Sequence, residues 1–218
     1  MTHIVPPAAR EEIVNHGRSL FDRGLATGSS GNISMRLDDG SILLTPTNSS
    51  MGRLEPERLS HLTAQGDQIS GDAPSKEAFL HLAIYGARPS ARAIVHLHAT
   101  YSAAVSCMDG LDNADCLPPL TPYYVMKIGY LPLLPYHRPG DPALGPRISA
   151  LATRHAAMLL ANHGPIVAGD TLAAAIDAIE ELEETAKLYL LLRNAATRPL
   201  NSEDIAELTR VFGARSAP

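Results

Sequence analysis

Residues 93–98 read AIVHLH, and residues 157–161 read AMLLA. Short apolar runs of this kind predict buried strands. Residues two apart in a strand project from the same face, so His96 and His98 are expected to point the same way. The second run leads directly into Asn162-His163-Gly164, which predicts a turn at the end of a strand. We therefore expect two buried strands with three histidines at their ends.

Helices and a hairpin are predicted around these strands. Alternating apolar and polar residues predict a hairpin over residues 32–45, with Asp39-Gly40 at its turn. Ser75 is a suitable N-cap for a helix that runs to Tyr85. Amphipathic patterns predict two further helices, Pro7–Arg23 and Thr171–Arg193. Because strands and helices alternate, we expect an α/β sandwich around a mixed sheet.

The bulk composition is that of an ordinary globular protein. The 218 residues are 45% hydrophobic and 19% charged, which fits one domain over residues 1–218. The net charge of -5 argues against nucleic acid or an anionic membrane as a partner. We find no signal-peptide pattern and no apolar run near the roughly 20 residues of a membrane span. A cytoplasmic setting is expected, with Cys107 and Cys116 as free thiols.

Other polar residues are expected to be structural. The long C-terminal helix carries an acidic run that we expect to be a solvated face or a subunit edge, not a metal site; it consists of Glu180, Glu181, Glu183 and Glu184. His81 and His155 are expected on helices, facing solvent or a neighbour. The remaining histidines lack paired spacing, and these are His3, His16, His61 and His137.

The histidines at the strand ends indicate a metal site. His96 and His98 have a spacing common among zinc and transition-metal ligands, although two polar residues on a solvated strand face are the alternative. His163 alone reads as a turn histidine, and it gains weight from that pair. Glu77 is expected in the first turn of a helix, where the helix dipole alone also explains a carboxylate. Three histidines and one carboxylate suit Zn²⁺ and can leave a coordination position for substrate.

Three short segments carry small hydrogen-bond donors that suit an anion. They are TGSSGN at residues 27–32, TPTNSS at residues 45–50, and Ser75-Lys76. Glycine and serine let backbone N–H groups approach an anion closely, and a helix N-terminus favours phosphate. Each segment alone is typical of an ordinary turn. They predict a phosphate site only if they converge on the metal ligands.

The ordered motifs resemble the class II aldolase and adducin family over roughly residues 10–193. The matching pieces are TGSSGNIS, LLTPT, GDAPSKEAFLHLAIY, AIVHLHATYSAAVSC, LPLLPY, LLANHGPIVAG and EELEETAKLYLLL. The resemblance implies a three-layer α/β/α sandwich around a mixed, largely antiparallel sheet. It also implies a homotetramer with active sites between subunits. The branch of 3-oxo-tetronate 4-phosphate decarboxylases is the closest, on TPTNSSMGRLEPERLS, ISGDAPSKE and LTPYYVMKIGYLPLLPYHRPGD.

The resemblance also implies roles for single residues. The metal ligands would be Glu77, His96, His98 and His163, and the phosphate-binding residues would be Asn32, Thr47, Asn48, Ser75 and Lys76. Glu77 falls on the position of the general acid/base. Tyr123 falls on a tyrosine donated by a neighbouring subunit, with Tyr124 as the alternative. Lys76 replaces a serine of the fuculose-phosphate aldolase motif, which suits a substrate carrying both phosphate and carboxylate; a lysine reaching into solvent is the other interpretation.

The implied reaction is decarboxylation of a 3-oxo-tetronate 4-phosphate to dihydroxyacetone phosphate through a metal-bound enediolate. Zn²⁺ is the expected ion, with Mn²⁺ or Co²⁺ as alternatives. An aldolase or 4-epimerase acting on fuculose or ribulose phosphate is the second interpretation. A non-catalytic adducin-like scaffold is the third, and the four candidate ligands argue against it.

Overall fold

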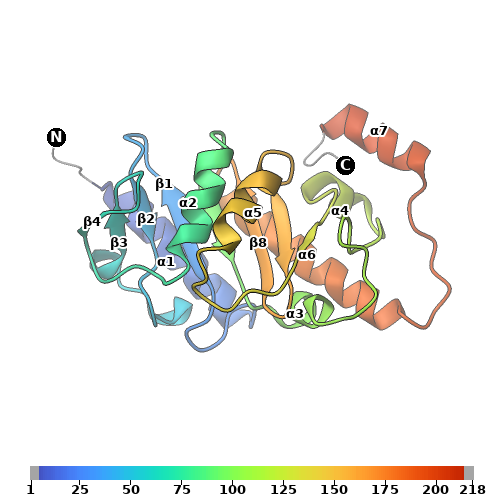
Figure 1. The fold of residues 1–218 in the computed structure, drawn as a ribbon, viewed down its shortest axis with the longest axis horizontal. Coiled ribbons are helices and arrows are strands. Elements are labelled where there is room, and N and C mark those ends of the chain that lie inside the picture. The colour runs from blue at the N-terminus through green and yellow to red at the C-terminus, as the bar shows by residue number, and fades with distance from the viewer. Residues whose placement is uncertain (1–4, 214–218) are drawn as a thin grey trace.

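The computed structural model describes residues 5–213, in which one mixed sheet lies between two layers of helices (Figure 1). His3 lies outside the described residues. The strands are β1 Asn32–Arg36, β2 Ile42–Leu44, β3 Ser60–Leu62, β4 Gln68–Ser70, β5 Ala93–His96, β6 Leu133–Leu134, β7 Ala157–Leu160 and β8 Gly164–Gly169. The helices are α1 Pro7–Asp22, α2 Ala78–Ala87, α3 Thr100–Ser106, α4 Pro122–Lys127, α5 Leu144–Ala152, α6 Leu172–Leu192 and α7 Ser202–Phe212. Two short 3-10 helices cover Met51–Arg53 and Pro56–Arg58.

The strand order is β4-β3-β2-β1-β5-β8-β7-β6. Neighbouring strands are antiparallel except for β6 and β7, which are parallel. Strand β5 therefore lies in the middle of the sheet, with β1 on one side and β8 on the other. The predicted mixed, largely antiparallel sheet is confirmed.

Strand β5 separates two hydrophobic cores. Val95 and Leu97 pack in the core beneath α1, α3 and α6, whereas Ile94 packs in the core beneath α2 and α5. This division follows from the alternation of side chains along a strand. All four strand residues are buried, so an imidazole on either face must find its partners inside the protein. The three-layer α/β/α arrangement is confirmed.

Most predicted elements appear near their predicted bounds. The hairpin is β1 and β2, the AMLLA strand is β7, and the two amphipathic helices are α1 and α6. Thr171 caps α6 by accepting a hydrogen bond from the Ala174 backbone nitrogen at 3.0 Å. Strand β5 ends at His96, two residues earlier than predicted, because His98 already belongs to the connection into α3. Cys107 and Cys116 are free, as predicted.

The predicted start of α2 is wrong. The helix begins at Ala78, and Glu77 occupies its N-cap position instead of its first turn. Ser75 does not cap the helix, because its Oγ accepts a hydrogen bond from the Glu77 backbone nitrogen and closes a tight local turn. This turn places the Glu77 side chain at the very end of the helix.

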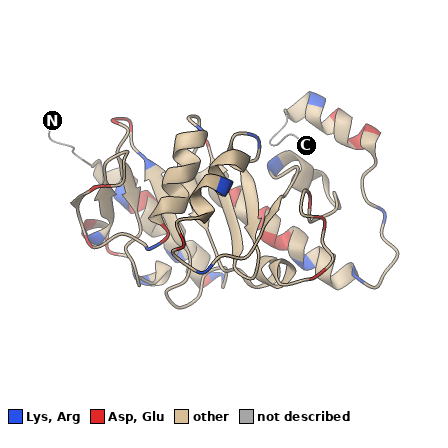
Figure 2. Ribbon diagram, viewed as in Figure 1, with Lys and Arg blue, Asp and Glu red and all other residues tan. Residues whose placement is uncertain are grey.

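Two further structural predictions need correction. Acidic residues lie along α6 (Figure 2), and their run was predicted to face solvent or a subunit edge. Glu183 of this run is instead buried. Its carboxylate accepts hydrogen bonds from the backbone at the start of α3, which makes its burial possible. His155 follows α5 instead of lying on a helix, whereas His81 lies on α2 and faces strand β1.

The segment after Asn194 leads to α7, which packs against α4 (Figure 1). The Leu200 backbone nitrogen donates to the Pro119 carbonyl at 2.9 Å, which holds the connection to α7 in place. No helix within residues 5–213 combines the length and apolar character that a membrane crossing requires.

Candidate metal centre

Three adjacent strands bring the predicted ligands together. Asn32 at the start of β1 lies opposite His96 at the end of β5, and His96 also pairs with Ile166 of β8. His98 follows β5 directly, and His163 stands in the turn just before β8. The neighbouring strand ends therefore position imidazoles that are 65 or more residues apart in the chain.

Two glycines allow the chain segments at this point to approach closely. Gly31 has a φ of +78°, and a Cβ placed on it would lie 2.7 Å from the His96 carbonyl oxygen. A Cβ on Gly164 would lie 2.4 Å from the Leu97 carbonyl oxygen. Contacts this short are prohibitive for a side chain, so both positions require glycine.

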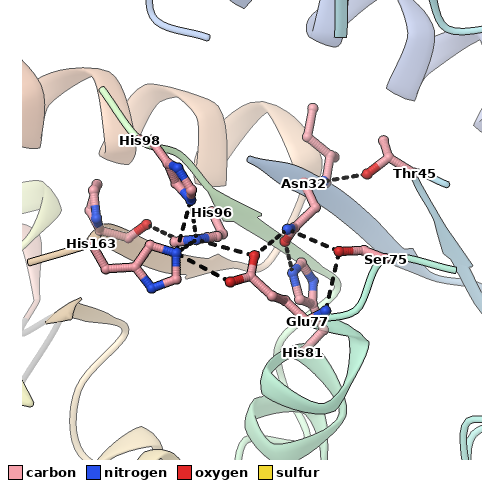
Figure 3. A network of polar contacts seen from close by, with 10 residues as sticks. Asn32, Thr45, Ser75, Glu77, His81, His96, His98 and His163 are labelled. Carbon is pink, nitrogen blue, oxygen red and sulfur yellow. Dashed lines mark hydrogen bonds and ion pairs between the residues drawn. The ribbon is translucent and has the colours of Figure 1, made fainter. Parts of the chain in front are cut away.

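The four predicted ligands form one cluster (Figure 3). The Nε2 atom of His98 lies 3.1 Å from that of His96 and 2.9 Å from that of His163, and the His96–His163 separation is 3.3 Å. Glu77 places Oε1 3.2 Å from the His163 Nε2 and Oε2 3.4 Å from the His96 Nε2. The four candidate ligand atoms all lie within 4.8 Å of one another.

This geometry fits a divalent cation. The His96 Nδ1 donates to the Pro165 carbonyl at 2.8 Å, so a neutral His96 presents the Nε2 lone pair to the cluster. Lone pairs converging at this distance repel one another unless a positive charge lies among them. A tetrahedral zinc site with Zn–N bonds near 2.0–2.1 Å has ligand atoms about 3.3 Å apart. The observed separations are close to that value, and Glu77 completes a set of three nitrogens and one carboxylate.

Burial and charge set the protonation states that a cation needs. Burial by itself would raise the pKa of Glu77, but the hydrogen bond from His163, the proximity of the His96 and His163 rings and the hydrogen bond from the Asn32 amide together hold that pKa below its usual range. Burial is the main cause that lowers the pKa of His96 to about 3, and it also lowers the pKa of His98. An ionised Glu77 beside neutral His96 and His98 rings is the state in which these groups bind metal.

A pocket of about 190 Å³ opens beside this cluster. The predicted site residues that line it are Asn32, Thr47, Asn48, Ser75, Lys76, Glu77, His98 and His163. His96 lies behind them and is fully buried. The predicted donor segments therefore do converge on the cluster, which sequence alone could not establish.

The donor segments brace one another. The Thr47 backbone nitrogen donates to the Ala73 carbonyl at 2.9 Å, and Pro46 forms an isolated bridge with Pro74. Asn48 holds a φ of 57°, which turns the chain sharply at the pocket wall. Within the described part of the chain, the Thr47 hydroxyl and the Lys76 ammonium make no hydrogen bond or ion pair, so both remain available to a ligand.

Sequence reasoning missed several residues of the site. Ser29, Ser30 and Gly31 line the pocket, and their segment was singled out only as a group. Pro139 also lines the pocket from the loop between β6 and α5, and no local pattern predicted this. His81 hydrogen-bonds Asn32 from α2, although its place on a helix indicated no link to the ligands.

Tyr123 does not line the pocket of its own chain. It lies on α4 and is 61% exposed, so it is free to contact another molecule. Tyr124 is buried, with its hydroxyl directed to the Leu117 carbonyl, and burial raises its pKa well above the ordinary value. Of the two tyrosines, only Tyr123 presents its side chain at the surface.

Known proteins share this sequence and this fold. Residues 11–190 match the family described as class II aldolase and adducin N-terminal domain. A 3-oxo-tetronate 4-phosphate decarboxylase from Pectobacterium atrosepticum is 55% identical over 201 residues, which cover 92% of each chain. An L-fuculose phosphate aldolase from Methanocaldococcus jannaschii is 33% identical, with 84% of this chain and 96% of the relative covered.

A solved structure agrees with these relatives. The crystal structure of a candidate aldolase/epimerase/decarboxylase from Klebsiella pneumoniae superposes with a TM-score of 0.92 at 49% identity, and covers 94% of this chain and 100% of its own. Family match, sequence identity and fold agree over nearly the whole length. The chain belongs to the class II aldolase and adducin family.

Proposed function

We propose that this chain is a metal-dependent carbon–carbon lyase that decarboxylates a 3-oxo-tetronate 4-phosphate to dihydroxyacetone phosphate and carbon dioxide. The observation that carries the proposal is the junction of two features in one pocket. Three imidazoles and a carboxylate form a cluster beside this pocket, and the Thr47 hydroxyl and the Lys76 ammonium line the same pocket without a partner among the described residues. The decarboxylase from Pectobacterium atrosepticum supports this substrate, since it is 55% identical over nearly the whole chain.

Glu77, His96, His98 and His163 are the proposed metal ligands, and Zn²⁺ is the proposed ion because nitrogen-rich tetrahedral sets suit zinc. Mn²⁺ and Co²⁺ are the alternatives. When bound, the ion supplies Lewis acidity that polarises the ketone beside the departing carboxylate.

The phosphate is proposed to bind to the donor residues that line the same pocket. Thr47, Asn48 and Ser75 would donate hydrogen bonds, and Lys76 would add a positive charge. The Ser75 Oγ already accepts from Asn32 and from the Glu77 backbone, so its own hydroxyl hydrogen is left for the ligand. Asn32 is the remaining member of the proposed set; since its Nδ2 donates to Ser75 and Glu77, it would act by holding the Ser75 hydroxyl toward the phosphate.

The reaction needs one bond broken and one proton delivered. The bond between C1 and C2 breaks, and its electron pair passes to C2 and the C3 carbonyl oxygen. A proton then adds at C2 and gives dihydroxyacetone phosphate. Glu77 is the proposed proton carrier within the chain, and Tyr123 of a neighbouring subunit is the proposed second donor. A homotetramer with pockets at subunit interfaces would bring that tyrosine to the site.

An aldolase reaction on a ketose phosphate is the second proposal. The relative from Methanocaldococcus jannaschii supports it, although its identity is lower. An aldolase would use the same ligands and the same phosphate-binding residues, and it would expel an aldehyde where the decarboxylase expels carbon dioxide.

The deciding experiment supplies the zinc-loaded protein with a 3-oxo-tetronate 4-phosphate and measures carbon dioxide and dihydroxyacetone phosphate together. We expect equal amounts of both, loss of activity in Glu77→Gln, and normal activity in Glu207→Gln, which changes an exposed carboxylate on α7. Cleavage of fuculose phosphate without carbon dioxide release would favour the aldolase. Activity that survives complete metal removal would contradict both proposals.

A further inference from the structure

A chain of hydrogen bonds joins the interior of α2 to the Glu77 carboxylate (Figure 3). The Asn32 Nδ2 lies 2.8 Å from the Glu77 Oε2, and the Asn32 Oδ1 lies 2.5 Å from the His81 Nε2. On the far side of the ring, the His81 Nδ1 lies 2.7 Å from the Ser34 Oγ, which lies 2.9 Å from the Tyr85 hydroxyl. This series of hydrogen bonds joins five side chains. They are Asn32 and Ser34 of β1, His81 and Tyr85 of α2, and Glu77 at the N-cap of α2.

The donor and acceptor roles follow from the carboxylate. An ionised Glu77 only accepts, so Asn32 must turn its Nδ2 toward it. The Asn32 Oδ1 then faces His81, whose Nε2 must carry the hydrogen. The His81 Nδ1 consequently accepts from the Ser34 hydroxyl, and the Tyr85 hydroxyl donates to Ser34. Every hydrogen bond in the chain points toward Glu77.

Water cannot replace any member of this chain from outside. Asn32, Ser34, His81 and Tyr85 are each 4% exposed or less. Burial lowers the pKa of His81 to about 4, against the opposing effect of Glu77, so the ring is neutral at neutral pH. A neutral imidazole has a hydrogen on only one of its two nitrogens. Which nitrogen carries it decides which neighbour receives a hydrogen bond from the ring and which donates one to it.

The tautomer of His81 decides which way the Asn32 amide faces. With the hydrogen on Nδ1, the Nε2 lone pair would face the lone pairs of the Asn32 Oδ1 and repel them. The Asn32 side-chain amide would then rotate by about 180°. The Asn32 Oδ1 would then face the Glu77 carboxylate, and the bonds from Nδ2 to Glu77 and Ser75 would both be lost. Such partners behind a ligand typically change metal affinity by 10–100-fold.

We infer that His81 is a positioning residue for the metal centre, and that it orients the Glu77 carboxylate through the Asn32 amide as the Nε2–H tautomer. It touches neither metal nor substrate. The inference rests on the proposed metal centre. It adds that a residue of α2 outside the four candidate ligands is needed for normal metal binding.

Two substitutions of nearly equal polarity distinguish the proposed hydrogen bond to Asn32 from a role of His81 in packing alone. His81→Gln can place an amide N–H near the position of Nε2, so it keeps the donor to Asn32. His81→Asn is shorter and reaches only the Ser34 side. We expect His81→Asn to lower Co²⁺ affinity about 10–100-fold and to change the visible Co²⁺ spectrum. His81→Gln should stay close to the wild-type affinity and spectrum.

His61→Asn is the matched control, because His61 is a buried histidine whose Nε2 lies 2.9 Å from the Ser41 Oγ, away from the ligands. It should retain the wild-type Co²⁺ affinity. Folding of each variant is checked by circular dichroism and thermal denaturation. Unchanged affinity and spectrum in a folded His81→Asn protein would overturn the inference.

A direct measurement needs no altered metal site. The ¹⁵N shifts of His81 in the metal-free wild-type protein should report a protonated Nε2 and a bare Nδ1 at pH 7, with the signals identified by their loss in His81→Gln. A protonated Nδ1 would overturn the inference even if His81→Asn fails to fold. A wild-type protein that binds no divalent ion would contradict the proposed function, while the tautomer measurement would still test the role of His81.

Discussion

The Glu183 Oε2 lies 2.6 Å from the Ser102 Oγ and 2.8 Å from the Ser102 backbone nitrogen, in the interior of the protein. The other carboxylate oxygen accepts from the Tyr101 backbone nitrogen at 2.8 Å. These bonds tie α6 to the first turn of α3, two residues after His98. A buried carboxylate thus holds the N-terminus of the helix that follows a candidate ligand.

Glu183→Gln should destabilise the protein by about 2–3 kcal/mol, because an amide brings its own hydrogens against N–H donors that are out of reach of water. Chemical denaturation in the presence of a chelator measures this loss. Glu184→Gln is the control, since Glu184 is 65% exposed and pairs loosely with Lys187. Equal stability of the two variants would contradict the role assigned to Glu183.

Gly31→Ala should destabilise the protein far more than Gly110→Ala. The two glycines have φ values of +78° and +76°, so the intrinsic cost of alanine is about 1 kcal/mol at each. Only at Gly31 would the new Cβ meet the backbone, at the His96 carbonyl oxygen. We expect a loss of at least about 3 kcal/mol and weakened metal binding for Gly31→Ala. Similar losses of stability in both variants would contradict this prediction, because they would mean that the backbone shifts enough to accommodate a Cβ at residue 31 beside the His96 carbonyl oxygen.

Asp115→Asn should change how stability depends on pH. Burial is the main cause that raises the pKa of Asp115 to about 6. The folded protein therefore binds more protons than the unfolded chain between about pH 4 and pH 6, and stability falls as pH rises through that window. Asparagine can still accept the bond from the Leu131 backbone nitrogen without carrying a charge.

The variant should be about 1–2 kcal/mol more stable than wild type at pH 7.5 and equal to it near pH 4, after allowance for the partial exposure of the carboxyl. Urea denaturation of the metal-free proteins at several pH values measures both curves. Asp109→Asn, which removes an exposed carboxyl, is the control variant measured beside it. A parallel offset at every pH would contradict the assignment.

Lys76→Ser should raise KM for a 3-oxo-tetronate 4-phosphate about tenfold or more, because an anion loses a charge-assisted contact at the pocket wall. The metal affinity and kcat should change little, since Lys76 is not a candidate ligand. Lys187→Ser on α6 is the control with the same loss of charge. An unchanged KM would mean that Lys76 reaches solvent and contacts no substrate.

The sequence predicted much of the site because its signals are local. The spacing of His96 and His98, and the turn that carries His163, require only strand periodicity and turn chemistry. The start of α2 was predicted wrongly because Ser75 could either cap the helix or close a turn with Glu77. Both are local hydrogen bonds of similar strength, and the packing of the chain decided between them.

Other features depend on contacts between distant segments, so no local pattern carries them. His81 faces Asn32 only because α2 packs over β1, and Pro139 reaches the pocket from a loop after β6. Glu183 resembles the other glutamates of its run in sequence. Its burial follows from the position of α3 against α6.

Residues 45–50 and 73–76 brace one another beside the candidate metal centre. The Thr47 backbone nitrogen donates to the Ala73 carbonyl, and Pro46 forms a bridge with Pro74. The three candidate histidines lie instead at the ends of β5 and β8. In the described part of the chain, residues 45–50 make no hydrogen bond or ion pair with the candidate ligands, whereas Ser75 holds the Glu77 backbone and the Asn32 amide. A library that diversifies residues 45–50 alone should therefore yield new substrate ranges without loss of divalent-metal binding, which makes this segment the natural target for redesign.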